Sequence, residues 1–138
     1  KLHAVQTEGC APLARAWKHA VASGGGKNAG PRWSECMWAW ETVQSSLADG
    51  ILDDETYDWV GVCNAMADSG GSPVVATEQH VVSAYALAHK VTSIDVSPTG
   101  TAGLAGLLAI RGEIANDERV VVVFSGVRRH FMPLPTAQ

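Results

Sequence analysis

Three short segments of this sequence place a hydroxyl or carboxylate side chain next to glycine, where the backbone can approach a ligand closely. They are Thr7-Glu8-Gly9, Ser97-Pro98-Thr99-Gly100 and Ser125-Gly126. Each follows a short apolar run that we expect to be a β-strand. Ligands of open parallel sheets bind beyond the carboxyl ends of the strands, so the three segments indicate a shared binding site. Ordinary turn and helix-cap chemistry uses the same residue types and is the alternative explanation.

Four short strands would position these segments, because four stretches are rich in small apolar or β-branched residues. They are predicted at residues 2–7, 73–76, 94–96 and 119–124. The last contains four consecutive valines followed by phenylalanine, and it is the clearest strand of the sequence. A run that is apolar on both faces is typical of a strand covered on both sides, usually in a parallel sheet.

Apolar residues recur at helical spacing between these strands, which predicts helices. Five helices are expected, beginning at Pro12, Ser34, Asp53 or Asp54, Thr77 and the turn at residues 97–100, and the second reaches Leu47 before Asp49-Gly50 stops it. Strands that alternate with helices indicate an α/β fold in three layers, with a mostly parallel sheet and helices on both faces. We expect a single domain over residues 1–138, with a linker-like stretch at 23–33 and an irregular tail at 127–138.

Composition and charge exclude several classes of function. The chain is 46% hydrophobic and 17% charged with a net charge of −4, which is typical of a globular domain and not of a basic nucleic-acid-binding surface. No apolar run approaches the ~20 residues of a membrane helix. Three widely spaced cysteines (Cys10, Cys36 and Cys63) without a CxxC motif indicate neither a disulfide framework nor a zinc site. We expect buried thiols in a reducing, cytoplasmic compartment.

Several stretches together resemble one enzyme family. Residues 1–16 (KLHAVQTEGCAPLARA), 95–110 (DVSPTGTAGLAGLLAI) and 120–126 (VVVVFSG) are similar to the C-terminal part of fold-type II pyridoxal-phosphate enzymes, the tryptophan synthase β-like superfamily. Residues 46–58 (SLADGILDDETYD) and the following Ser69-Gly70-Gly71 make threonine synthase and its near relatives the closest match. The resemblance runs in order along nearly the whole chain. Because Lys1 leads straight into an apolar segment, we expect a fragment of a longer enzyme.

The resemblance implies roles for the residues of two strand-end segments. Ser125, with Gly126 behind it, matches the residue that hydrogen-bonds the pyridine nitrogen of the cofactor. A neutral hydroxyl there would leave the nitrogen largely unprotonated, which suits elimination and replacement reactions. Thr99 and Gly100 would line the cofactor side of their turn, with simple N-capping as the alternative. Ser97 stands where relatives often carry glutamate, so no acid or base role is assigned to it.

Metal and substrate contacts are less well supported by the resemblance. Glu8 matches a glutamate that helps to bind a divalent cation in the dehydratase and racemase branch, but Ala14 stands where the second acidic ligand would be. A lone carboxylate is a poor magnesium or calcium site, so we expect no metal and a loop-positioning role for Glu8. Arg128 and Arg129 are candidates for contact with an anionic substrate group near Ser125.

The implied activity is that of a threonine synthase-like lyase acting on amino acids by β,γ-elimination and replacement, or by the related elimination of ammonia from threonine or serine. The lysine that forms the Schiff base with the cofactor precedes this segment in the family, and Lys18, Lys27 and Lys90 match no such motif. We therefore expect no catalytic residue here, an inactive isolated chain, and a complementing N-terminal segment or a homo-oligomer. The alternative is a non-catalytic α/β module that binds a partner chain or a small metabolite.

Overall fold

The computed structural model describes residues 1–22 and 30–127. Its sheet consists of two parallel strands, β1 (Val5–Thr7) and β2 (Val74–Ala76), with Val5 opposite Val74 and Thr7 opposite Ala76. The glycine-rich part of the expected linker and all but the first residue of the expected tail, including Arg128 and Arg129, lie outside the described residues.

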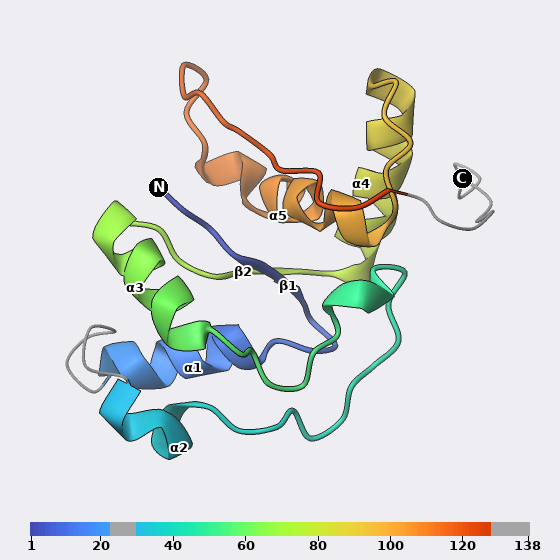
Figure 1. Ribbon diagram of the computed structural model, residues 1–138. Coiled ribbons are helices and arrows are strands. Elements are labelled where there is room, and N and C mark those ends of the chain that lie inside the picture. Colours follow the sequence, from blue (N-terminus) through green and yellow to red (C-terminus); the bar gives the residue numbers. More distant parts are fainter. Residues whose placement is uncertain (23–29, 128–138) are drawn as a thin grey trace.

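Helices cover the two faces of this sheet (Figure 1). On one side lie α1 (Pro12–Ala22), α2 (Trp33–Cys36) and α3 (Trp59–Ser69), and on the other lie α4 (Glu78–Val91) and α5 (Ala102–Ile110). Single turns of 3-10 helix complete the described elements: η2 (Gly30–Arg32), η3 (Asp49–Ile51), η4 (Thr99–Thr101) and η5 (Arg111–Glu113). The expected α/β architecture, with a parallel sheet between helical layers, is confirmed.

Local signals explain where the best-predicted helices begin. Thr77 caps α4 by accepting a hydrogen bond from the His80 backbone N–H, while the His80 ring accepts one from the Thr77 N–H. This reciprocal arrangement satisfies two backbone donors that the helix itself cannot. Lys90 in the last turn lies where the helix dipole favours positive charge. The sequence around α4 is therefore consistent with helix formation at both ends.

Two apolar clusters hold the layers together. The first joins α1, α2 and α3, and its buried members are Leu13, Ala16, Ala20, Cys36, Met37, Trp59, Cys63 and Met66. The second lies between the sheet and helices α4 and α5, and its buried members are Ala48, Ala76, Val81, Ala84 and Ala105. The second cluster is made mostly of alanine, so α4 and α5 lie close to the strands.

The helix predicted from Ser34 to Leu47 is wrong, because α2 ends at Cys36 and residues 37–48 are irregular. Backbone groups of this stretch find partners elsewhere: the Arg15 guanidinium donates to the carbonyls of Trp38 and Ala39. The Trp40 N–H donates to the Asp54 carbonyl at 2.9 Å. These long-range bonds replace the helical ones. The Asp54 carbonyl lies in a segment of bends and a turn ahead of α3, which starts at Trp59 and not at the predicted aspartates.

Two predicted strands do not form. Val96 makes only an isolated antiparallel bridge with Val127, and the valine-rich stretch 119–124 has no strand partner among the described residues. The stretch runs alongside α5 (Figure 1), with Val121 90% and Val123 70% exposed. A strand is defined by its neighbour, and β1 pairs only with β2 in the described chain. The expectation that the valines lie within the parallel sheet is therefore wrong for this chain.

No helix in the described ranges is both long enough and apolar enough to cross a membrane.

Candidate functional site at the carboxyl ends of the strands

Two of the three predicted strand-end segments meet in the structure. The Ser97 N–H donates to the Gly126 carbonyl at 3.0 Å, and the Ser125 N–H donates to the Gly100 carbonyl at 3.3 Å. Within the first turn, the Gly100 N–H donates to Ser97 Oγ at 3.0 Å. The turn at 97–100 and the segment 125–126 thus form one unit, although neither follows a regular strand.

Gly100 is required by this contact. A Cβ atom at position 100 would lie 2.2 Å from the Gly126 carbonyl oxygen and 2.7 Å from Val96 Cγ2. Neither neighbour is the flexible end of a long side chain, so a larger residue would push the two segments apart. The glycine therefore fixes where the Ser125 backbone lies.

Thr99 holds a segment that the sequence analysis did not assign to the site. Its Oγ1 accepts a hydrogen bond from the Gly50 N–H at 3.1 Å, and a Cβ atom at position 50 would lie 2.9 Å from that same oxygen. No side-chain cap from Thr99 to a helix is found in the described chain. We call residues 44–51 the strap, because they connect this turn to the end of β1.

The third predicted segment, Thr7-Glu8-Gly9, is connected to the other two through the strap. Glu8 continues the pairing of β1, since its N–H donates to the Ala76 carbonyl at 2.9 Å. Its carboxylate accepts a hydrogen bond from the Glu78 N–H at 2.9 Å, at the first residue of α4. The Glu78 carboxylate in turn accepts one from the Leu47 N–H at 2.7 Å. Glu8 thus acts on helix α4 and, through it, on the strap.

Sequence reasoning missed both the strap and Glu78. Asp49-Gly50 is predicted only as the end of a helix, and the sequence pattern assigns no role to Glu78. The usable signal was the stretch 46–58, which carries part of the family resemblance but lies in no expected strand. Its place at the strand ends follows from contacts between residues far apart in the sequence.

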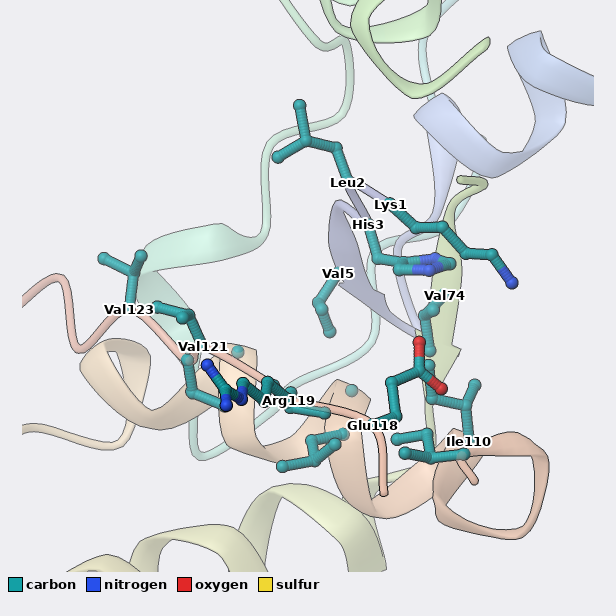
Figure 2. A pocket seen from close by; sticks show the side chains of 16 residues that line it. Lys1, Leu2, His3, Val5, Val74, Ile110, Glu118, Arg119, Val121 and Val123 are labelled. Atoms are coloured by element: carbon teal, nitrogen blue, oxygen red, sulfur yellow. The ribbon is translucent and has the colours of Figure 1, made fainter. Parts of the chain in front are cut away.

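An apolar groove of about 470 Å³ lies between β1 and the valine-rich stretch (Figure 2). Val5 and Val74 of the sheet form one wall, and Val121 and Val123 lie along the other. Helix α5 contributes its residues Gly103, Gly106, Leu107 and Ile110, and charged groups at the groove include Lys1, Glu118 and Arg119. The groove is distinct from the hydrogen-bonded turns, but the valine-rich stretch leads directly to Ser125.

A cluster of aromatic and charged side chains lies on the opposite helical layer. The Arg15 guanidinium is 3.9 Å from the ring centre of Trp38 and 4.9 Å from that of Trp40, and it forms an ion pair with Glu41 at 2.9 Å. Hydrogen bonding from the Trp38 indole, then from the Glu41 backbone and Arg15, lowers the pKa of the Glu41 carboxyl. Both charges of this cluster have a partner, so we interpret Trp38 and Trp40 as structural residues.

The family of the chain is decided by a match that covers most of its length. A family model described as pyridoxal-phosphate-dependent enzyme matches residues 1–126. The chain belongs to this family. Pyridoxal phosphate is accordingly the cofactor of the enzymes to which it is related.

A solved structure supports the same fold for this pyridoxal-phosphate family member. The crystal structure of a threonine deaminase from T.th. is similar over 95% of this chain with a TM-score of 0.69, at 18% sequence identity. The chain spans 41% of that protein's length. No curated protein matches the sequence.

The residues of segment 125–126 fit one part of such a cofactor. Ser125 is exposed, its backbone is fixed by the bond to Gly100, and its hydroxyl has no hydrogen-bond partner within residues 1–22 and 30–127. A hydroxyl can donate to a ring nitrogen, so Ser125 has the donor and the access that this contact needs. Gly126 lies beside it, whereas the Thr99 hydroxyl is already bonded to Gly50.

Proposed function

We propose that this chain is the C-terminal part of a pyridoxal-phosphate-dependent lyase that acts on amino acids, with a reaction of the threonine synthase type: β,γ-elimination and replacement. The family match over residues 1–126 carries the proposal. The likeness to a threonine deaminase supports the fold, and the stretch 46–58 supports threonine synthase as the nearer relative.

In this proposal the chain holds and tunes the cofactor and does not itself react. Bound pyridoxal phosphate supplies an electron sink for carbanion chemistry on an amino acid. The Ser125 hydroxyl donates a hydrogen bond to the pyridine nitrogen and keeps it neutral. Gly126 leaves room beside that contact, Gly100 fixes the backbone of Ser125, and Thr99 secures the strap. The lysine that binds the cofactor lies outside these 138 residues.

The groove beside β1 gives this enzyme a place for its remaining part. The structurally similar threonine deaminase is more than twice as long as the region matched here, since the chain spans 41% of it. Val120–Val123 form an extended apolar wall, and such exposed valines are typical of a contact surface. We therefore assign the groove to an extended, apolar strand from the N-terminal part of the same enzyme, with a second copy of this chain as the competing occupant.

Substitution of Ser125 in the complete native enzyme tests the function. We expect Ser125→Ala to lower the rate of elimination about tenfold or more, because the hydrogen bond from the Ser125 hydroxyl to the pyridine nitrogen is lost. The absorbance of the bound cofactor should shift as well. Ser125→Thr keeps the hydroxyl and should keep most of the activity. A complete protein that binds no pyridoxal phosphate, or equal activity in both variants, would overturn the proposal.

The isolated chain provides the complementary test. Mixed with pyridoxal phosphate, it should show no visible absorbance band that borohydride fixes to one of its lysines. Such a fixed band would mean that a lysine within residues 1–138 binds the cofactor. It would contradict the assignment of the reactive lysine to another segment.

A non-catalytic module is the second candidate, because the exposed valines would equally fit a separate partner chain. In that case the chain would be complete as it stands and would bind a separate protein through the groove. The mass of the protein in its native source separates the two: a longer chain that contains a cofactor lysine supports the enzyme, and a mature chain of 138 residues supports the module.

We also place the enzyme in the reducing environment of the cytoplasm. Cys10, Cys36 and Cys63 are all buried and free, and disulfides are rare in that compartment. Burial, with the neighbouring Cys36, raises the pKa of the Cys63 thiol to about 11, so this cysteine is mostly protonated near neutral pH.

A further inference from the structure

The strap crosses the carboxyl ends of the strands and is bonded at both of its ends. Near its beginning, the Gln44 N–H donates to the Gly9 carbonyl at 3.2 Å. Near its end, the Gly50 N–H donates to Thr99 Oγ1 at 3.1 Å. Both glycines are approached closely, since a Cβ atom at Gly9 would lie 2.8 Å from Gln44 Cβ. The strap therefore connects the end of β1 to the turn that carries the Ser125 contact.

One carboxylate holds the middle of the strap. The Leu47 N–H donates to Glu78 Oε1 at 2.7 Å, which is the shortest of the strap's contacts and is strengthened by the charge of the acceptor. Next to it, Ala48 is fully buried in the cluster shared with Ala76 and Ala105. Leu47 and Ile51 of the strap also pack, partly buried, against this cluster. Apolar packing is not directional, so the hydrogen bond to Glu78 is the contact that fixes the register of the strap.

Glu78 is itself held by a second carboxylate. Its backbone N–H donates to Glu8 Oε1 at 2.9 Å, so the start of α4 is tied to the end of β1 while the Glu78 side chain reaches the strap. Negative charge is favourable at a helix N-terminus, and both carboxylates lie there. The contacts form one continuous path: Glu8, Glu78, the strap, Thr99, and then Gly100 with Ser125.

We infer that Glu78 is a positioning residue, which fixes the strap against the strand ends and thereby sets the Gly50–Thr99 contact beside Ser125. The inference rests on the proposed function for its consequence in catalysis, since the strap is bonded to the turn that holds Ser125. The positioning of the strap by Glu78 concerns residues of this chain alone and does not depend on the proposed function. Glu78 acts through the strap, and Glu8 holds the backbone of Glu78 by accepting its N–H.

Hydrogen exchange of the isolated chain tests the structural part. We expect Glu78→Ala to speed exchange of the Leu47 and Gly50 amides about tenfold, the scale of one charged hydrogen bond, while the amides of α3 are unchanged. Glu78→Gln keeps an acceptor oxygen and should have a smaller effect. The matched control is Gln79→Ala, an exposed neighbour bonded only to Ser83 in the described chain, which should leave both amides unchanged.

Two outcomes would overturn the positioning role. One is faster exchange at the Leu47 amide alone, with exchange at Gly50 unchanged. In that case the Leu47–Glu78 hydrogen bond acts only locally and does not determine the Gly50–Thr99 contact. If all amides of α4 change with Leu47, Glu78 stabilises the helix and does not place the strap. Glu8→Gln should reproduce the change at Gly50 in weaker form, because it acts one contact further away.

Kinetics of the complete enzyme test the consequence separately. We expect Glu78→Ala to raise KM for the amino acid about tenfold with a smaller change in kcat, because Glu78 acts on the site only through the strap and the turn at residues 97–100 and touches no reacting bond. Glu78→Gln should restore most of the affinity. An unchanged KM would contradict the inference, whereas a complete protein without any cofactor would contradict the proposed function and leave the exchange result to decide on the strap.

Discussion

The two helical layers of this protein differ in how completely they are closed. Between α1, α2 and α3, the large side chains of Trp59, Cys63 and Met66 are at most 1% exposed. On the other face, α5 is apolar throughout its nine residues, yet its larger side chains are only partly buried. They are Leu104, Leu107, Leu108 and Ile110. The centre of the first layer is closed within the chain, although Trp33 at its edge is 43% exposed. The large apolar side chains of α5 have no such closed centre.

This difference shows that apolar sequence alone does not determine burial. The valine-rich stretch is the most apolar run predicted as a strand, and Val121 is nevertheless 90% exposed. It lies on the open side, next to the groove and α5. The open layer is where we propose that the remaining part of the enzyme docks, and the closed layer contains Trp59, the largest fully buried side chain of the described residues.

The closed layer should therefore respond most strongly to truncation. Trp59 is fully buried and contacts Trp33 edge to face at 5.4 Å, so we expect Trp59→Ala to lower the free energy of unfolding by about 3–5 kcal/mol. Trp59→Phe should cost much less, because the indole N–H it removes has no partner in the described chain. Urea unfolding followed by circular dichroism measures both. An equal loss in the two variants would contradict this explanation.

The same change of valine to alanine compares a closed position with an open one. Val81 is 1% exposed in the cluster beneath α4, and Val81→Ala should cost about 2 kcal/mol. Val121→Ala should stay within about 0.5 kcal/mol in the isolated chain. If the groove is filled in the complete enzyme, the second substitution becomes costly there, and unfolding of both proteins in urea would reveal the change.

The packing of α5 on β1 gives a smaller effect. A Cβ atom at Gly106 would lie 2.3 Å from Val5 Cγ2, so Gly106→Ala should destabilise the chain by about 1–3 kcal/mol through overpacking, against a gain of about 1 kcal/mol in helix propensity. Adding Val5→Ala should restore part of the loss. Gly112→Ala is the matched control, because no atom lies within 4 Å of its Cβ position. Thermal unfolding of the four proteins separates packing from propensity.

The cap of α4 gives the next effect in size. Thr77→Ala removes the side-chain oxygen that accepts from the His80 N–H, and we expect a loss of about 1 kcal/mol. Thr77→Ser keeps the acceptor and should be nearly neutral. Urea titration of both variants is sufficient, and a loss from Thr77→Ser as large as that from alanine would show that packing of the Thr77 methyl group matters more than the cap.

Local signals made part of this fold predictable from the sequence. Helices α1 and α4 begin where Pro12 and Thr77 predict them, and α5 follows the expected turn at residues 97–100. Non-local contacts made the rest unpredictable. The Arg15 guanidinium binds the carbonyls of residues 38–39, which therefore do not continue the expected second helix. The valine-rich stretch pairs with no strand in the described residues, because pairing depends on a neighbouring strand and not on composition.

The candidate site divides in the same way. The rule that ligands gather at strand ends led to the segments 97–100 and 125–126, and the structure joins them. Their role at a cofactor stays a prediction. Glu78 could not be found, because its contact with Leu47 spans 31 positions and follows no motif. Sequence patterns indicated which residues could do chemistry, whereas the strap that connects them became visible only in three dimensions.

Lowering the pH should destabilise the closed layer slightly more than the open layer, because the closed layer contains the Glu41 carboxyl. Hydrogen bonds from the Trp38 indole and the Glu41 backbone, with Arg15, lower the pKa of this carboxyl in the folded chain. Its contribution to stability is therefore complete above the pKa of the unfolded chain and is lost as pH falls through the folded pKa. The effect is the smallest of the set because the carboxylate is exposed and salt screens it.

Unfolding by urea at neutral and at acid pH measures this contribution. The difference in stability between the two pH values should shrink in Glu41→Gln, which cannot titrate, and also in Trp38→Phe, which removes the indole hydrogen bond, the largest cause of the lowered pKa. High salt should reduce the difference in the wild-type chain. If Glu41→Gln keeps the full pH dependence, another acidic group controls it, and the Arg15 cluster holds residues 38–41 by its stacking on the tryptophan rings alone.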